Sequence, residues 1–308
     1  MTLILDRAEP IVALPAEDAP PERVRRRLAE PGRATMRDVP RYWYVMTLLI
    51  RKEVRLRYRY SSLGYLWAYV RPAMQFCVYY FVIGILLDIT KKVDNFAVFV
   101  FSGLCIVTVY NTTVNSATKS VVKNKSIIKK VDIPRELFPV SALVVSMTRL
   151  VPLMTILLIG ATVTGWELTW VSVAAALLGF LIVVLLSFGI GLLFSALYVF
   201  LRELQHILEI TGFMTHWLVP MVHPWFIAQE RLERFPGGDI IMIVYLWNPL
   251  CTSVELFHKA FWLSTVDNGS LSPHLWTRGA FSVGFCLVLI AFAQFVFARL
   301  RELMAEEL

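Results

Sequence analysis

Long apolar runs recur along the chain, and most of them have the length that crosses a lipid bilayer. A spanning helix needs about 20 mostly apolar residues, because it rises about 1.5 Å per residue through about 30 Å of hydrocarbon. Charges inside the runs are few: Arg71 and Arg149 lie near the starts of the first and third. The pattern predicts an all-α integral membrane protein with a transmembrane domain over 63–300. Its six expected spans cover about 65–87, 96–118, 142–164, 170–200, 206–222 and 279–298.

One further apolar run, 240–254, does not fit this pattern. It is too short to span comfortably, and Asn248 and Pro249 interrupt it. It lies in the segment 223–276, which is rich in Trp and Pro. Irregular backbone at membrane depth is tolerated only where protein or a water-filled cavity covers it. We therefore expect 223–276 to form a re-entrant or interfacial helical hairpin on the extracytoplasmic side, before the last span.

The segment before the first span has two different sides. At about 100° per residue, Arg51, Arg55 and Arg59 fall on one arc, and Met46 and other apolar residues fall opposite, where Glu53 interrupts them. This predicts a basic amphipathic helix over about 36–62 at the inner membrane surface. A plain juxtamembrane anchor that only follows the distribution of positive charge explains the same cations equally well.

The loop 119–139 is the longest basic connection between spans. Pro134 and Pro139 punctuate it, and Asp132 is placed to cap a short helix. A rigid, basic element of this kind is suited to docking on a cytosolic partner. The alternative is a simple connector whose lysines follow the charge distribution.

Composition agrees with the membrane assignment. Hydrophobic residues make up 57% of the 308 residues, charged residues make up 17%, and mean hydropathy is +0.62. Soluble chains have about 45–50% hydrophobic and about 25% charged residues. The composition therefore disfavours a disordered chain, a disulfide-stapled secreted fold and an ordinary soluble enzyme. The four cysteines lie in or beside apolar runs without a CxxC pair, which is typical of small buried residues. Residues 1–35 lack an apolar run and are expected to be a flexible cytosolic tail.

Lysine and arginine are unevenly divided between the two sides of the predicted topology. With six spans, 22 of the 30 fall on the side of the termini and five on the other side. Because cytoplasmic loops carry the excess of these residues, the sequence predicts that both termini, including 301–308, are cytosolic. The net charge of +7 is then a membrane-protein feature, and nucleic acid is not an expected partner. The expected location is the cytoplasmic (inner) membrane, in contact with its lipids.

Motifs for catalysis and nucleotide binding are missing from the chain. It contains no GxxxxGK[ST], GxSxG or GxGxxG pattern, and its histidines form no metal-binding motif. The usual phosphate loop for ATP hydrolysis is therefore absent. We expect no catalytic residue, no metal and no cofactor in this chain, and any ATPase that drives transport would be a separate subunit.

Four short stretches together resemble a known family. The basic and aromatic run from Arg55 to Pro72, the loop from Ile128 to Pro139, Arg202 with Glu203, and Asn248 with Pro249 follow one another in the order found in permeases of ATP-binding-cassette polysaccharide exporters. The resemblance covers about residues 40–300. Such permeases move O-antigen, teichoic acid, capsule or galactan chains.

The resemblance implies partners and roles that hydropathy does not. It implies a homodimer with the channel between two copies, two copies of an ATPase subunit that carry ATP and Mg²⁺, and a polyprenyl-diphosphate-linked glycan as cargo. The coupling contacts with the ATPase would come from Ile127, Ile128, Lys129, Lys130, Asp132, Pro134, Arg135 and Glu136. Arg51, Arg55 and Arg59 would hold the lipid diphosphate or orient the interface helix. Tyr69, Phe76, Tyr80 and Trp247 are candidates for channel or gate aromatics.

Two alternatives stay open. An exporter of drugs or small lipids would use the same fold. A membrane enzyme acting on lipid-linked glycans would need clustered carboxylates or a base, and the five acidic residues of 223–276 show no evident pairing in the sequence.

Overall fold

A computed structural model describes residues 42–58, 66–129, 133–267, 269–301 and 303–307. Within these ranges the secondary structure is helical and no strand occurs, which confirms the all-α fold. The elements are α2 (Trp43–Tyr58), α3 (Trp67–Tyr79), η4 (Tyr80–Leu86), η5 (Ile89–Lys91), α4 (Phe96–Lys123), α5 (Lys125–Ile128), α6 (Leu137–Met147), α7 (Leu150–Val163), α8 (Trp170–Phe200), α9 (Leu204–Leu218), α10 (Trp225–Leu232), α11 (Gly238–Trp247), α12 (Pro249–Phe257), η6 (His258–Trp262), η7 (Leu263–Thr265), α13 (Leu275–Leu300) and α14 (Met304–Glu307).

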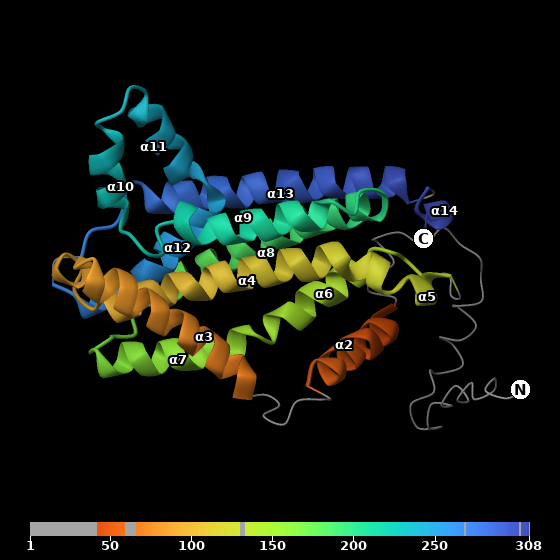
Figure 1. The fold of residues 1–308 in the computed structure, drawn as a ribbon, viewed down its shortest axis with the longest axis horizontal. Helices are drawn as coiled ribbons and strands as arrows, with labels where there is room; N and C mark the ends of the chain where they lie inside the picture. The colour runs from red at the N-terminus through yellow and green to blue at the C-terminus, as the bar shows by residue number, and fades with distance from the viewer. Residues whose placement is uncertain (1–41, 59–65, 130–132, 268, 302, 308) are drawn as a thin grey trace, which may run out of the picture.

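The bundle is elongated and its two ends differ in content (Figure 1). At one end lie α2, α5 and α14, and we call this the α2 end. At the other end lie α10, α11 and α12, and we call this the α12 end. The long helices α4, α8 and α13 run between the two.

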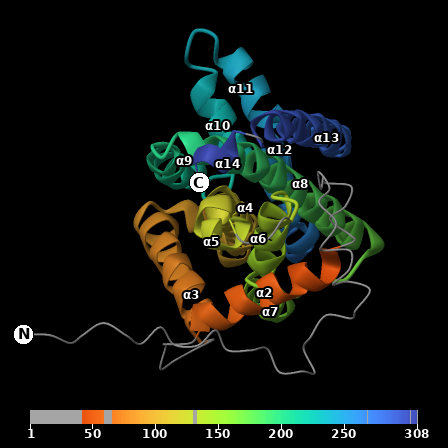
Figure 2. The ribbon, with the colours of Figure 1, turned by 90° about the vertical axis from the view of Figure 1, so that its right-hand side faces the viewer.

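Helices α4 and α8 form the centre of the bundle (Figure 2). α8 packs along both α4 and α13, and α6 covers another side of α4. A Cβ added to Gly191 of α8 would stand 2.6 Å from the Cβ of Ala117 on α4. Small residues allow helix backbones in a membrane to approach closely, so this pair permits the tight α4–α8 contact.

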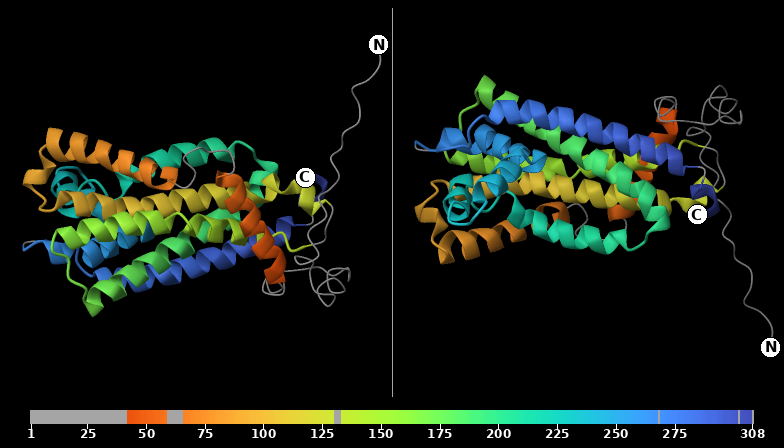
Figure 3. Two further views of the ribbon diagram at one scale, coloured as in Figure 1. Left: turned by 90° about the horizontal axis from the view of Figure 1, so that it is seen from below. Right: turned by 90° about the horizontal axis from the view of Figure 1, so that it is seen from above.

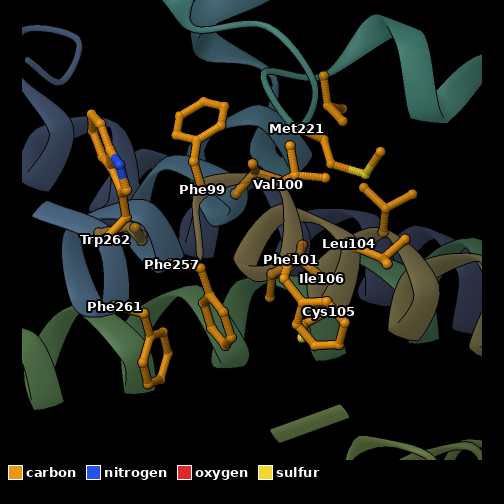
Figure 4. Close-up of a cluster of buried hydrophobic side chains, with 14 of the residues drawn as sticks. Phe99, Val100, Phe101, Leu104, Cys105, Ile106, Met221, Phe257, Phe261 and Trp262 are labelled. Carbon is orange, nitrogen blue, oxygen red and sulfur yellow. The ribbon is translucent and has the colours of Figure 1, made fainter. Parts of the chain in front are cut away.

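The core at the α12 end joins α4 to the segment before α13. Residues from Phe99 to Ile106 pack with Phe257, Phe261 and Trp262 of α12 and η6, and with Met221 of the turn after α9 (Figure 4). This apolar packing holds α12 against the middle of the bundle.

Among the residues that the structure describes, five helical segments are long and apolar enough to cross a membrane: Trp67–Leu86, Phe96–Lys123, Leu137–Val163, Trp170–Phe200 and Leu275–Leu300. They correspond to five of the six predicted spans, and α8 has the predicted bounds. α4 continues five residues past the expected end at 118. The third segment is broken between α6 and α7, where Pro152 has no N–H to donate to the carbonyl of Thr148.

The fifth predicted span differs from the expectation. α9 has 15 residues, which corresponds to about 22 Å of rise, and it is not among the five segments long enough to span. It ends at Leu218, four residues before the expected end at 222, because the backbone turns extended at Val219 and Pro220 follows. α9 nevertheless runs along the bundle from the α2 end toward the α12 end (Figure 1).

The segment between α9 and α13 begins and ends at the α12 end (Figure 1). Within it, Gly238–Trp247 and Pro249–Thr265 meet at 67°. Asn248 caps the second helix by accepting the N–H of Leu250 at 2.9 Å, and Pro249 occupies its first turn. The bend is that of a broken span or of a re-entrant loop. α10 and α11 lie side by side before it (Figure 1); we call the segment from α10 to α12 the hairpin, and its depth in a bilayer stays a prediction.

Candidate functional site

α4 carries polar residues on its half toward the α2 end, on a face that neighbouring helices cover only in part. We call this set the polar stripe: Thr108, Asn111, Thr112, Asn115, Ser116 and Lys119, all half-buried. At about 100° per residue they span an arc of about 140°. Polar residues within membrane helices usually face a bundle interior or a water-filled cavity. The stripe therefore indicates a hydrated surface along α4.

The stripe leads into a cavity of about 430 Å³ at the α2 end. We call it the basic cavity, because three cations and one carboxylate line it. Its lining residues are Glu53, Leu56, Asn115, Ser116, Lys119, Ser120, Lys123, Asn124, Phe138, Ser141, Ala142, Val145 and Arg149. The walls thus come from α2, α4, α6 and the break before α7. The cavity combines positive charge with an apolar side, an arrangement suited to an anionic amphiphile.

Two polar contacts tie α2 to the end of α4 at this cavity. Lys123 Nζ lies 2.5 Å from Glu53 Oε2, and Lys52 Nζ donates to Asn124 Oδ1 at 3.3 Å. The other oxygen of Glu53, Oε1, is buried and has no hydrogen-bond partner among the described residues. These contacts give a reason for the acidic residue that interrupts the apolar arc of the helix.

The predicted α2 cations lie away from the cavity. α2 buries Met46 and Leu49 in a core cluster with α6 and lies across the bundle rather than along it (Figure 3). Arg51 and Arg55 are exposed on its other side, and neither lines the basic cavity. Arg59 lies outside the described residues, as does the tail 1–35.

The predicted coupling loop has an open part. α5 places Ile127 and Ile128 half-buried against the core cluster at the α2 end, and Lys129 is exposed after them. Lys130 and Asp132 lie outside the described residues. The open part consists of α5 and Lys129, and it is accessible to a partner.

The rest of that loop packs against the bundle, and its expected contact with a partner stays a prediction. Pro134 and Glu136 are buried, and Glu136 Oε1 lies 3.7 Å from Arg301 and accepts from Gln294 at 3.4 Å. The Arg135 guanidinium donates to the carbonyl of Arg301. Pro134 and Glu136 therefore do not present a surface to a partner here, and Glu136 and Arg135 fasten the loop to the end of α13.

The four predicted channel aromatics do not form one group. Phe76 of α3 lies 5.5 Å from Phe101 and 5.7 Å from Tyr80, measured between ring centroids, and Tyr80 lies 6.4 Å from Phe96. These four rings form what we call the aromatic cluster, on the α12 side of the polar stripe. Tyr69 is half-buried, two turns before Phe76 on α3.

Trp247 lies in a different environment. It sits at the end of α11, is 39% exposed, and meets Phe281 of α13 edge-on at 4.9 Å. The aromatic cluster therefore holds two of the four predicted side chains, and Trp247 belongs to the hairpin and α13.

Polar contacts in the middle of the bundle were not predicted from the sequence. Gln75 of α3 lies 3.1 Å from His216 of α9, and Asn111 donates to the carbonyl of Gly212 on α9 at 3.2 Å. They link α3, α4 and α9 where the polar stripe approaches the aromatic cluster. In the sequence, a polar residue at the centre of an apolar run, such as Gln75, could have indicated such a contact between helices.

A buried ionic cluster at the α12 end was also missed. Arg278 of α13 donates to Glu255 of α12 at 2.8 Å and to the carbonyl of Leu246 at 2.8 Å. Ser272 bonds to both charged groups. We call Glu255, Ser272 and Arg278 the buried clamp, because they join α11, α12 and α13. The signal in the sequence was an arginine at the start of an apolar run and a glutamate within another.

Comparisons with known proteins agree along most of the chain. Residues 44–225 match the family described as ABC-2 type transporter. An O-antigen export system permease protein RfbA of Myxococcus xanthus is 24% identical over 277 residues, covering 89% of this chain and 98% of that protein. A protein of the same description from Klebsiella pneumoniae is 22% identical, covering 85% and 94%. The polysialic acid transport protein KpsM of Escherichia coli is 23% identical, covering 72% and 82%.

Proposed function

The chain belongs to the ABC-2 type transporter family, and from this premise we propose that it is the channel-forming permease subunit of an ATP-driven exporter. The cargo is a polysaccharide linked to a polyprenyl diphosphate, moved across the cytoplasmic membrane. Relatives described as O-antigen and polysialic acid transport proteins support this proposal, because the two export permeases match over nearly their whole length.

The observation that carries the proposal is the polar stripe of α4 together with the basic cavity into which it leads. A hydrophilic polymer cannot cross hydrocarbon and needs a continuous hydrated path. Asn, Thr and Ser side chains can exchange hydrogen bonds with hydroxyl groups and water as a chain slides past. The aromatic cluster at the far end of this path is suited to closing it when no polymer is present.

A partner ATPase follows from the family and from the sequence. The chain has no phosphate-loop motif, so we propose that two copies of a separate subunit bind ATP and Mg²⁺. We propose that the open part of the loop, with Ile127, Ile128 and Lys129, is its docking contact. Arg135 and Glu136 would then pass the movement of that loop to α13.

A second copy of the chain completes the channel in this proposal. α3 has no buried residue, and apolar side chains of α9 such as Phe213 and Trp217 are exposed. Two such helices flank the polar stripe, so another copy of the same surface would enclose it away from lipid. The excess of positive charge supports the α2 end as cytosolic, with both termini on that side.

Deletion of the gene tests the function. We expect polymer on its polyprenyl carrier to accumulate in the cytosolic leaflet, and a plasmid copy to restore export. The measurement is mass spectrometry of lipid extracts together with surface labelling of the glycan. Sensitivity to small compounds without trapped polymer would contradict the proposal and favour an exporter of drugs or small lipids.

A further inference from the structure

The cations of the basic cavity have no assigned ligand. We propose that this cavity binds the diphosphate group of the lipid-linked cargo, and that the Lys123–Glu53 ion pair is a latch which the diphosphate opens. The inference rests on the proposed function, from which the diphosphate lipid is taken. The site for the diphosphate headgroup would then consist of α4 side chains and Arg149, and not of the exposed α2 cations Arg51 and Arg55 that the sequence suggested.

The lining of the cavity holds more cations than carboxylates. Lys119 and Lys123 are four residues apart on one helix face, a spacing at which like charges repel. Among the described carboxylates, only Glu53 pairs with Lys123, and none pairs with Lys119. Arg149 lines the same cavity at the break between α6 and α7. A bound dianion would relieve this repulsion through charge-assisted hydrogen bonds.

The dimensions and the lining fit a diphosphate that carries a lipid chain. Four residues of helix separate Lys119 from Lys123 by about 6 Å along the axis, so adjacent phosphates can each meet one ammonium group. The volume of about 430 Å³ is within the usual range of ligand pockets, about 300–1,000 Å³. Leu56, Phe138 and Val145 form an apolar side, along which an isoprenoid chain can leave toward the bilayer.

The latch follows from competition for one ammonium group. Glu53 is carried by α2, and its carboxylate holds Lys123 of α4 at 2.5 Å. A phosphate that binds Lys123 displaces this carboxylate and releases one of the contacts between α2 and α4. Loading of the cavity would thereby change how α2 is held, at the end of the bundle where the ATPase is proposed to dock.

The test uses the full chain in nanodiscs of neutral lipid, with farnesyl diphosphate as the probe. We expect Lys119→Gln and Arg149→Gln each to weaken binding about tenfold, which corresponds to about 1.4 kcal/mol. Glu53→Gln should tighten binding severalfold, because it frees Lys123. The matched control is Lys125→Gln, an exposed cation that does not line the cavity, for which the dissociation constant should change less than twofold. Size-exclusion profiles verify that each variant is folded.

Three results would overturn the inference. Unchanged binding of farnesyl diphosphate in both Lys119→Gln and Arg149→Gln would show that the basic cavity is not the binding site. A tenfold loss of binding in Arg51→Gln alone would place the site on the exposed face of α2. Equal competition by phosphatidylglycerol vesicles or by farnesyl monophosphate would show a general phosphate site. The deletion experiment above distinguishes the two proposals. If polymer is trapped in the deletion strain but the protein does not bind farnesyl diphosphate, only the diphosphate site is rejected. If the protein binds farnesyl diphosphate but no polymer is trapped, the proposed export of polysaccharide is rejected.

Discussion

The two ends of the bundle hold charged side chains in opposite ways. At the α12 end, the side chains of Arg278 and Glu255 are 2% and 1% exposed and bond to each other at 2.8 Å. At the α2 end, Lys123 and Glu53 are 58% and 20% exposed around a cavity. The first pair directs its hydrogen bonds to neighbouring protein groups, and the second lies at the wall of a cavity.

This difference distinguishes charges that are enclosed by protein from charges that line a cavity. Arg278 bonds to α11 through the carbonyl of Leu246 and to α12 through Glu255, so its charge serves to hold the hairpin. The lining of the basic cavity holds three cations and one carboxylate, and that carboxylate pairs with Lys123. We therefore expect changes at the α12 end to affect stability and changes at the basic cavity to affect binding.

The largest effect is expected from Arg278→Met. Breaking a buried ion pair leaves an uncompensated charge and costs about 3–5 kcal/mol, so the variant should lose much of its folded population. Thermal unfolding in detergent measures the loss. Replacing Glu255 by Leu in the same chain should recover most of it, because an apolar pair of similar volume is often neutral.

Arg234→Met is the matched control for that variant. Arg234 pairs with Glu230 at 3.0 Å, with the two side chains 64% and 63% exposed, and exposed pairs contribute about 0–1 kcal/mol. If Arg278→Met proved as stable as this control, the buried clamp would have no structural role.

The next largest effect is expected where α12 packs on α8. A Cβ on Gly179 would stand 3.0 Å from Phe257 and 3.1 Å from the carbonyl oxygen of Ser253. Gly179→Ala should therefore destabilise by about 1–3 kcal/mol, as overpacking does. Gly160→Ala adds a Cβ with nothing within 4 Å, so it should be neutral or slightly stabilising. The same unfolding assay compares them, and similar melting temperatures would contradict the close contact.

The hydrophobic pattern was sufficient for most of the architecture and insufficient for the site. α8 was found at 170–200 because both its flanks change polarity abruptly. α4 was ended too early, at 118, because Lys119 and Lys123 leave the apolar pattern although the helix continues beside the cavity. The bounds of α9 depended on the turn at Val219 and Pro220, which hydropathy does not register.

Contacts between distant segments were the part that the sequence could not provide. Glu255 and Arg278 are 23 residues apart and meet only because the hairpin returns to α13. Glu53 and Lys123 are 70 residues apart and meet where α2 crosses the end of α4. A single sequence contains the charges of such pairs and no record of their pairing.

Glu136 is a buried charge at the α2 end, so it tests whether burial, and not the end of the bundle, decides the effect on stability. Glu136→Gln weakens its interaction with Arg301 and should lower stability by about 1 kcal/mol. Lys129→Gln, at an exposed position, should leave stability unchanged and reduce copurification of the ATPase. Unfolding temperature and subunit ratio are measured on the same preparations. Loss of the ATPase from Glu136→Gln at unchanged stability would instead make Glu136 a direct contact.

Only a small change in stability is expected from Glu53→Gln. Lys123 is more than half exposed, so solvent screens the pair, and its removal should change stability by no more than about 1 kcal/mol. The difference between wild type and variant should shrink as salt rises from 0.05 to about 0.5 M, since exposed charges are screened within a few ångströms there. The effect of Arg278→Met should be nearly independent of salt, because no solvent reaches that pair. An equally large, salt-independent loss in Glu53→Gln would mean that the pair at the α2 end is a structural clamp as well, and not a latch that a ligand can open.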